Sequence, residues 1–338
     1  MDILEGVSLK KHNTFGINVK AKYFVEVKTE AELVEFCESG FLEGKQHVVL
    51  GSGSNILFTK DFDGVVIKNS IEGFVYKKSG KLIRVIAGGG TNWHDLVMDS
   101  LKNGANGLEN LALIPGTVGA APVQNIGAYG LELKSVFEQL RAIEISTGKL
   151  KVFTKAQCSF KYRSSVFKEE LKGKYVITEV TLDLHNTDKV NTIYAPIRIA
   201  LEKKGIENPT SQDVCEVVME IRNSKLPNPA KIGNAGSFFK NPVIPKVTYK
   251  ELQIKNNGMP AFPQAANNKV KVPAAWLIES AGWKGKSIGD AGVHEDQALV
   301  LVNHGKSSGR EISDLSKEIQ ASVFKKFKIN LDVEVNIL

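Results

Sequence analysis

The spacing of apolar residues changes between strand-like and helix-like patterns along this chain. Short apolar runs predict strands at residues 23–27, 47–50, 65–67, 82–87 and 298–302. Between these runs, apolar residues recur every three to four positions, as on the buried face of a helix. The helical patterns are introduced by a capping box of Thr29 and Glu32, by Thr91, by Ser211 and by Pro273, and a last one carries Ile312, Leu315, Ile319 and Val323. Strands that alternate with helices indicate an α+β or α/β class.

The sequence predicts where the last third of the chain begins and how it ends. The sequence Leu-Pro-Asn-Pro at 226–229 ends the helix that follows Ser211, and we expect a domain boundary there. Residues 331–337 alternate with a period of two, which predicts a terminal strand. On such a strand Glu334 shares a face with Asp332 and Asn336, so the residues alone favour a solvated glutamate on an edge.

Glycine-rich turns without charge are the most unusual feature of the pattern. Residues 111–130 contain no charged side chain and four glycines, so this stretch must be buried or covered by a ligand. Two further glycine turns, 51–55 and 88–90, directly follow predicted strands, an arrangement that can bring backbone N–H groups to a phosphate. For any one loop, glycines that simply mark a turn explain the pattern equally well. Three such loops favour a large ligand, such as a dinucleotide with a pyrophosphate.

The common nucleotide and metal motifs do not fit these loops. A G-x-G-x-x-G motif fails at 51–56 because Ile56 occupies the last position, and it fails at 88–93 because of Trp93. A Walker A loop fails at both G-K-S sequences, where Ser280 and Val300 replace the required glycine. No H-E-x-x-H occurs and the six histidines are scattered, so we expect no metal.

Composition and charge indicate which classes of partner the chain would bind. The chain has 338 residues, 42% apolar and 24% charged, which suits two or three globular domains. A net charge of +7 favours anionic ligands such as phosphates. The longest basic run, Lys325-Lys326-Phe327-Lys328, lies near a predicted helix end, where cations are favourable. Basic and aromatic residues are not interleaved on one face, so we expect no nucleic-acid partner.

The cysteines and the apolar runs indicate the compartment. Cys37, Cys158 and Cys215 are far apart and odd in number, which argues against a disulfide framework and favours a reducing compartment. The first residues lack the pattern of a signal peptide, and no apolar run approaches the ~20 residues of a membrane span. We therefore expect a cytoplasmic protein with no membrane partner.

Several motifs together resemble the UDP-N-acetylenolpyruvoylglucosamine reductases. Two of them are glycine loops, GSGSN at 51–55 and LIPGTVGAAPVQNIGAYG at 113–130. The others are LKKHNTFG at 9–16, YRSS at 162–165, GNAGSFFKNP at 233–242 and the stretch 274–303. They follow the family's order and spacing along almost the whole chain, so the combination is specific although each motif alone is weak.

The resemblance implies an α+β protein of three domains. Residues 1–70 with 331–338, and residues 71–222, would form an FAD-binding fold like that of the vanillyl-alcohol-oxidase-like flavoproteins. Residues 223–330 would form the substrate-binding domain. Because that FAD fold uses different loops, the resemblance also accounts for the failed Rossmann motif. The segment with Tyr194 resembles the additional tyrosine-bearing loop of the family's longer subtype, and we expect a monomer.

The resemblance also implies a reaction. In this family NADPH reduces FAD, and a hydride passes from flavin N5 to C3 of the enolpyruvyl group of UDP-N-acetylenolpyruvoylglucosamine, while a proton reaches C2. The product is UDP-N-acetylmuramate, a precursor of cell-wall peptidoglycan. The chemistry requires a cation that stabilises an enediolate, a proton donor at C2, and an orienting group near the substrate carboxylate.

Three residues match the family's catalytic positions. Arg163 would stabilise the enediolate, since a guanidinium binds a carboxylate with two hydrogen bonds and stays charged. Ser237 would donate the proton, and Glu334 would point into the cleft near Arg163. The residues alone allow plainer roles. Arg163 could be a surface arginine and Ser237 a small turn residue.

The resemblance assigns binding residues in the same way. The expected FAD contacts are Gly51, Ser52, Gly53, Ser54, Asn55, Pro115, Gly116, Thr117, Gly119, Ala120, Ala121 and Gly127. The expected substrate contacts are Tyr162, Tyr194, Arg222, Lys225, Asn241 and Gln297. Lys225 could instead be a cation at a helix C-terminus, and Tyr162 a packed aromatic. Ser52 stands where a glycine is usual, so a positive φ there would carry a cost.

Two other hypotheses compete with the reductase function. A different flavin-dependent oxidase or dehydrogenase of the same fold would act on another small molecule. Such enzymes often bind FAD covalently through His or Cys, and the flavin loops hold neither. A non-catalytic nucleic-acid binder would account for the basic charge, and the absence of bound flavin would favour it.

Overall fold

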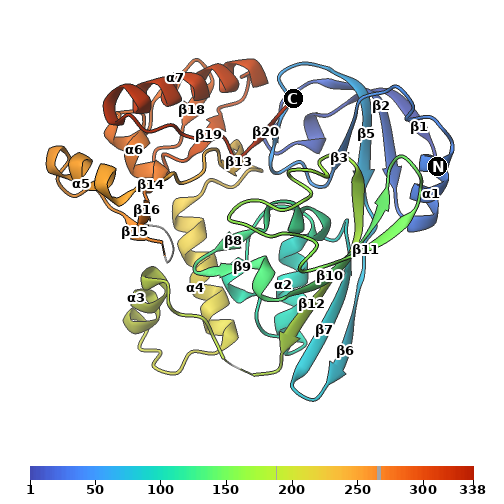
Figure 1. Cartoon of the computed structure of the whole chain (residues 1–338), viewed down its shortest axis with the longest axis horizontal. Helices are drawn as coiled ribbons and strands as arrows, with labels where there is room; N and C mark the ends of the chain where they lie inside the picture. Colours follow the sequence, from blue (N-terminus) through green and yellow to red (C-terminus); the bar gives the residue numbers. More distant parts are fainter. Residues whose placement is uncertain (188, 265–267) are drawn as a thin grey trace. The chain divides into compact units, whose positions relative to one another are not determined.

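The computed structural model describes residues 1–187, 189–264 and 268–338 (Figure 1). The chain divides into two compact units. The first unit consists of Met1–Val7, Lys20–Gly53 and Phe62–Ser224. The second consists of Ser8–Val19, Ser54–Asp61 and Lys225–Leu338. Each unit is therefore assembled from three pieces of the chain.

A four-stranded sheet begins the first unit. Its strands follow the order β1 (Ile3–Ser8), β2 (Lys20–Val27), β5 (Phe62–Asn69) and β3 (His47–Leu50). β5 pairs in parallel with both β2 and β3, so all three run in one direction. Helix α1 (Glu30–Glu38) starts at the predicted capping box, in which Thr29 accepts from the Glu32 N–H. Leu33 and Phe36 of α1 are buried with Val25, Val65 and Ile67 of the sheet. The three predicted strands and the helix of this segment are confirmed.

A five-stranded antiparallel sheet forms the larger part of the first unit. Its order is β11 (Leu150–Thr154), β10 (Phe137–Glu144), β12 (Tyr175–His185), β7 (Leu82–Gly88) and β6 (Phe74–Ser79). The long strands β6, β7 and β12 lie side by side in Figure 1. Only β7 was predicted from its apolar run. The other strands have polar residues on their second face, so they do not form the continuous apolar runs that predict a strand.

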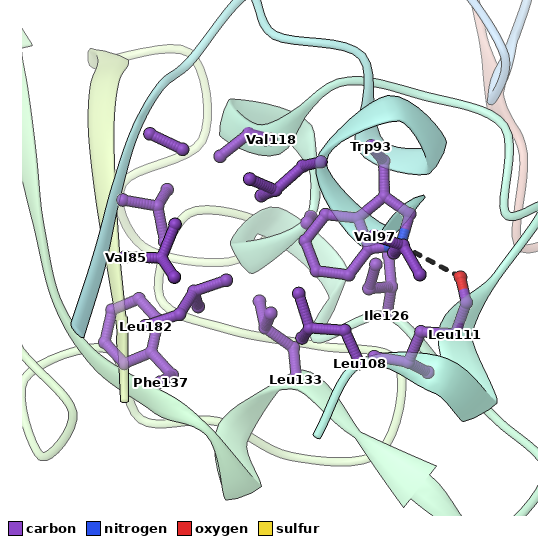
Figure 2. Packing of buried hydrophobic residues seen from close by; sticks show 14 of the residues in the cluster. Val85, Trp93, Val97, Leu108, Leu111, Val118, Ile126, Leu133, Phe137 and Leu182 are labelled. Atoms are coloured by element: carbon purple, nitrogen blue, oxygen red, sulfur yellow. Dashed lines mark hydrogen bonds between the residues drawn. The ribbon is translucent and has the colours of Figure 1, made fainter. Parts of the chain in front are cut away.

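Helix α2 (Trp93–Lys102) builds the central core of this unit. Its Trp93, Leu96 and Val97 are buried, and the Trp93 Nε1 donates to the Leu111 carbonyl at 3.0 Å (Figure 2). The predicted helix is confirmed, but its predicted cap is wrong. Asn92, not Thr91, is the N-cap, because its side-chain oxygen accepts from the N–H groups of His94 and Asp95.

The uncharged stretch 111–130 forms short pieces rather than one helix, as predicted. The stretch contains the end of η2 (Glu109–Leu111), the 3-10 turns η3 (Val118–Ala120) and η4 (Pro122–Gln124), and β8 (Gly127–Ala128). After it come β9 (Leu131–Glu132), which forms a hairpin with β8, and the 3-10 turn η5 (Leu133–Ser135). Leu111, Val118 and Ile126 point into the core around Trp93 (Figure 2). Much of this stretch is therefore buried in the protein itself.

Two helices complete the first unit. They are α3 (Ala195–Lys203) and α4 (Ser211–Lys225). Val214, Val217 and Val218 of α4 are buried and Ile221 is partly buried, so the predicted helical face is confirmed.

The second unit has its own sheet and helices. The sheet is antiparallel, in the order β13 (Gly233–Ser237), β19 (Val300–Asn303), β18 (Ala291–Val293) and β17 (Ser287–Ile288). Smaller elements are η1 (Lys10–His12), β14 (Val243–Pro245), α5 (Lys246–Lys255), β15 (Phe262–Pro263), β16 (Lys269–Lys271) and α6 (Ala274–Ser280). Helix α7 (Gly309–Phe327) buries Ile312, Leu315, Ile319 and Val323, as predicted. Pro273 is the N-cap of α6 and lies before its first turn, contrary to the prediction.

The predicted terminal strand is mostly wrong. Only β20 (Asn336–Ile337) forms, pairing in parallel with β4 (Ile56–Leu57), while Val333 makes an isolated bridge with Phe239. Leu331, Glu334 and Val335 are buried, so burial does not follow the two-residue period. The segment pairs with two different partners, and a change of partner breaks the alternation that a single sheet would impose.

Two features of the described residues concern membranes and metals. No helix among them is long and apolar enough to cross a bilayer. No group of three or more His, Cys, Asp and Glu side chains in the described ranges is arranged to hold a metal ion.

Candidate active site

The first glycine turn contains a buried hydroxyl beside a cation. Lys68 Nζ donates to the Gly51 carbonyl at 2.5 Å, and burial lowers the pKa of Lys68. The Ser52 Oγ is buried and has no hydrogen-bond partner among the described residues. The backbone of Ser52 lies outside the left-handed region, whereas Gly53 has φ +68°, so Ser52 carries no backbone strain. A turn that combines a buried hydroxyl without a partner and a carbonyl bound by a lysine ammonium suits a polar or anionic ligand atom.

Two glycines of the other loops are required by packing of the chain on itself. A Cβ on Gly89 would lie 2.1 Å from the Ile177 carbonyl oxygen of β12, and one on Gly119 would lie 2.8 Å from the same atom. The Gly119 N–H also donates to the Gly89 carbonyl at 2.8 Å. A Cβ on Gly51 would lie 2.4 Å from the Thr117 Oγ1. Packing of the chain on itself is therefore sufficient to require glycine at these positions.

Arg163 is held against the turn of residues 127–130. Its Nη2 donates to the Gly127 carbonyl at 2.7 Å, and its guanidinium carbon lies 5.4 Å from the ring centre of Tyr162. A Cβ on Gly127 would lie 3.2 Å from the Arg163 Nη1, so glycine permits this approach. Arg163 also has φ +53°, an unfavourable backbone conformation for arginine. Arg163 is partly buried and is held by these contacts.

Tyr129 of the same turn joins two predicted substrate residues. Its hydroxyl interacts electrostatically with the guanidinium of Arg222, and burial lowers the pKa of that arginine. The Arg222 Nε is buried and has no partner within the described chain. The Tyr129 ring meets the ring of Tyr194 edge-on, with centroids 5.3 Å apart. Tyr129 was not predicted as a site residue, although it lies inside the quoted glycine motif.

His94 supports the neighbouring loop. Its Nδ1 accepts the Leu113 N–H at 3.2 Å, and Leu113 has φ +56°. Burial lowers the pKa of His94, Asp95 opposes this shift, and Arg222 adds to it. His94 is therefore a neutral acceptor that stabilises a strained turn.

In the second unit, the segment of Ser237 lies beside that of Glu334. Ser237 is exposed at the end of β13, between Gly236 with φ +67° and the buried Phe238. The Glu334 N–H donates to the Phe238 carbonyl at 2.8 Å. Glu334 is only 9% exposed, so the interpretation as a solvated edge glutamate is wrong. Asn55 also approaches this segment, with its Nδ2 3.5 Å from the Glu334 carbonyl.

The other predicted substrate residues of the second unit have identifiable local roles. The Asn241 Oδ1 accepts the Ala274 N–H at 2.9 Å, so it caps α6, whose own N-cap residue is a proline. The Gln297 Oε1 accepts the Leu299 N–H at 3.4 Å. Lys225 is exposed as the last residue of α4. Each side chain keeps donor groups beyond these contacts.

The predicted site residues come from both units. Those in the first unit are Gly51, Ser52, Gly53, Pro115, Gly116, Thr117, Gly119, Ala120, Ala121, Gly127, Tyr162, Arg163, Tyr194 and Arg222. Those in the second unit are Ser54, Asn55, Lys225, Ser237, Asn241, Gln297 and Glu334. The expected proximity of Arg163 and Glu334 stays a prediction, because these residues belong to different units.

Two family models match the chain. The model described as "FAD binding domain" matches residues 21–154. The model described as "UDP-N-acetylenolpyruvoylglucosamine reductase, C-terminal domain" matches residues 228–338.

Similar proteins span the whole chain. A UDP-N-acetylenolpyruvoylglucosamine reductase of Flavobacterium johnsoniae is 46% identical over 340 residues, covering 100% of both chains. The protein of the same name from Pseudomonas fluorescens is 44% identical over 338 residues, covering 100% of this chain and 99% of its own. A solved structure of such a reductase from Thermus caldophilus has a TM-score of 0.67 at 21% identity, and covers 99% of this chain and 98% of its own. That likeness confirms the α+β fold.

Proposed function

Since the chain belongs to the family of UDP-N-acetylenolpyruvoylglucosamine reductases, we propose that it uses FAD and NADPH to reduce UDP-N-acetylenolpyruvoylglucosamine to UDP-N-acetylmuramate. The observation that carries this proposal is similarity over the full length of relatives that bear this name. The reaction would provide a precursor for peptidoglycan synthesis. A flavin enzyme of the same fold with another substrate has no comparable support.

The loops of the first unit fit a flavin dinucleotide. The unpaired Ser52 hydroxyl and the neighbouring Lys68 would face polar atoms of FAD. We propose that FAD also contacts Gly51, Gly53, Ser54, Asn55, Pro115, Gly116, Thr117, Gly119, Ala120, Ala121 and Gly127. Bound FAD would supply the hydride-transfer chemistry, with NADPH as the source of reducing equivalents. The protein's own residues bind, orient and protonate the substrate.

Arg163 would bind the substrate carboxylate. Charge that develops on the enolpyruvyl group during reduction is delocalised into this carboxylate, so a fixed cation there stabilises the transition state. The hydrogen bond to the Gly127 carbonyl and the contact with the Tyr162 ring hold the guanidinium in place before substrate binds. A preoriented arginine loses little further conformational freedom during the reaction.

Ser237 would give a proton to C2 of the substrate. Its hydroxyl is exposed at a strand end whose position is set by the buried rings of Phe238 and Phe239. Glu334 would orient the reacting groups, since its segment is bonded to the Phe238 carbonyl. A weak acid is sufficient here, because the proton goes to a carbanion-like carbon.

Six polar side chains would bind the substrate. Tyr194, Lys225, Asn241 and Gln297 would surround the UDP diphosphate, Arg222 would point to the same cleft, and Tyr162 would place the substrate or the nicotinamide. Arg222 supports the assignment because its guanidinium is partly buried and its Nε has no partner among described residues. Tyr194 would place this chain in the family's longer subtype with the extra tyrosine loop.

The organisation proposed for the chain follows the same resemblance. We assign residues 1–70 with 331–338 and residues 71–222 to the FAD-binding fold, and residues 223–330 to substrate binding. The enzyme would work as a cytoplasmic monomer. These assignments rest on the family motifs and their order along the sequence.

An anaerobic absorbance experiment tests the function. NADPH should bleach the visible absorbance of the purified yellow protein, and UDP-N-acetylenolpyruvoylglucosamine should restore it within one turnover. Bleaching without restoration would retain the flavoprotein but reject the substrate. Protein that binds no FAD would reject the whole proposal.

A further inference from the structure

The turn of residues 127–130 contacts three predicted site residues of the first unit. Arg163 donates to the Gly127 carbonyl, and the Arg222 guanidinium interacts electrostatically with the Tyr129 hydroxyl. Tyr194 packs edge-on against the Tyr129 ring. Tyr129 itself has φ +50°, so this turn does not hold its shape through backbone preference. Other groups must fix it.

Asn110 is the group that fixes this turn. Its side chain is fully buried. Its Nδ2 donates to two carbonyls, that of Tyr129 at 3.0 Å and that of Asn191 at 2.9 Å. One amide group therefore joins the turn to the segment that leads into Tyr194.

The Asn191 side chain adds a second connection. Its Nδ2 donates to the Gly130 carbonyl at 3.1 Å, and its Oδ1 accepts the Ile193 N–H at 3.2 Å. Tyr194 follows directly as the N-cap residue of α3, and it is 38% exposed. Tyr194 therefore belongs to a segment that Asn110 links to the turn.

We propose that Asn110 is a positioning residue of the enzyme, which holds the Tyr129 turn and the Tyr194 segment together for binding of the nucleotide diphosphate. This inference rests on the proposed function. Asn110 does not touch substrate; it acts through Tyr129 and Tyr194. Both of its N–H donors are used in the connection, so a residue without donors leaves two buried carbonyls unpaired.

Asn106 offers a matched control. It lies four residues before Asn110 and is also buried. Its Nδ2 donates to the Thr187 carbonyl at 3.2 Å. Thr187 lies before the segment 191–194 in the chain. Asn106→Ala therefore removes a similar hydrogen bond without releasing the Tyr129 turn.

The first measurement does not depend on activity. Amide hydrogen exchange of the FAD-loaded protein should become about tenfold faster at residues 127–130 and 191–194 in Asn110→Ala, because local opening becomes easier. Asn106→Ala should leave both segments unchanged. If Asn110→Ala does not fold, Asn110→Ser, which keeps one donor, is measured instead and should show a smaller change in the same segments.

The second measurement separates positioning from general loss of structure. Asn110→Ala should raise KM for UDP-N-acetylenolpyruvoylglucosamine about tenfold, while bleaching by NADPH keeps its rate. In a Tyr194→Ala background the same substitution should change KM by less than about twofold, since coupled residues are not additive. A full tenfold effect in that background, or unchanged exchange in both segments, would overturn the inference. If the parent protein does not turn over this substrate, the proposed function fails, and the exchange result alone decides the role of Asn110.

Discussion

At the scale of single residues, the loops of the first unit are stabilised by contacts from distant side chains. Leu113, Tyr129 and Arg163 all have positive φ although none is glycine. Each such conformation costs about 1–2 kcal/mol relative to a relaxed backbone. The Leu113 N–H donates to His94 and the Arg163 guanidinium donates to the Gly127 carbonyl. The Tyr129 carbonyl accepts from Asn110, so each strained residue is held by the surrounding fold. Strained residues of this kind cluster at functional sites.

The His94 contact predicts a pH dependence of stability. The folded protein holds His94 neutral with a lowered pKa, so the unfolded chain binds the proton more readily. Stability should therefore be full above about pH 6.5, decrease as the pH falls below that value, and level off below the folded-state pKa. Urea unfolding of the parent and of His94→Gln at about pH 7.5 and about pH 5.5 measures this.

Glutamine can accept the Leu113 N–H but does not titrate, so His94→Gln should lose less stability between the two pH values than the parent. An identical loss in both proteins would show that other groups cause the pH dependence.

At the scale of elements, capping side chains decide where helices begin. α1 and α7 both start with a complete capping box, formed by Thr29 with Glu32 and by Ser308 with Glu311. Such boxes use residues three positions apart, so they can be identified from sequence. α2 is capped by Asn92 without a reciprocal partner, and the prediction placed the cap one position too early, at Thr91, because both residue types favour caps.

Replacement of the α2 cap gives a direct test. Asn92→Ala should destabilise the first unit by about 1 kcal/mol, because the N–H groups of His94 and Asp95 lose their acceptor. The shift of the urea midpoint measures the effect. Asn103→Ala is a control at the other end of the helix, where the side-chain amide donates to the carbonyl and the carboxylate of Asp99. Equal shifts for both variants would contradict the assignment of Asn92 as the cap.

At the scale of the whole molecule, the residues proposed for catalysis are divided between the two units. Arg163 belongs to the first unit, and Ser237 and Glu334 belong to the second. The proposed FAD loops Pro115–Thr117 and Gly119–Ala121 lie in the first unit as well. This division predicts that the two half-reactions can be separated by substitution.

Ser237→Ala should separate them. Bleaching by NADPH should proceed at nearly the parent rate, while restoration by substrate should slow about a hundredfold or more, because only the second step needs the proton. Stopped-flow absorbance measures both rates. Ser287→Ala, also in the second unit, is the control and should change neither rate. Equal slowing of both steps would exclude Ser237 as the proton donor.

Much of the local structure could be predicted because its causes are local. The strand 47–50, the capping box of Thr29 and the apolar face of α7 depend on neighbours within one turn or one strand. Strands β6 and β11 were not predicted because polar residues interrupt their apolar runs, and β10 and β12 were not predicted because their pairing joins segments far apart in the chain. The terminal segment failed for the same reason, since its pairing with both Phe239 and Ile56 cannot be read from alternation.

The sequence by itself determined the family, the order of the site motifs and the candidate residues, because these depend on residue types at fixed spacing. Only the tertiary structure decided which side chains meet. It buried Glu334, placed Lys68 beside the Ser52 turn, and joined Asn110 to both Tyr129 and Asn191. Asn110 and Asn191 lie 81 positions apart in the chain. Contacts over such distances depend on how sheets and loops pack, and no pattern of neighbouring residues records them.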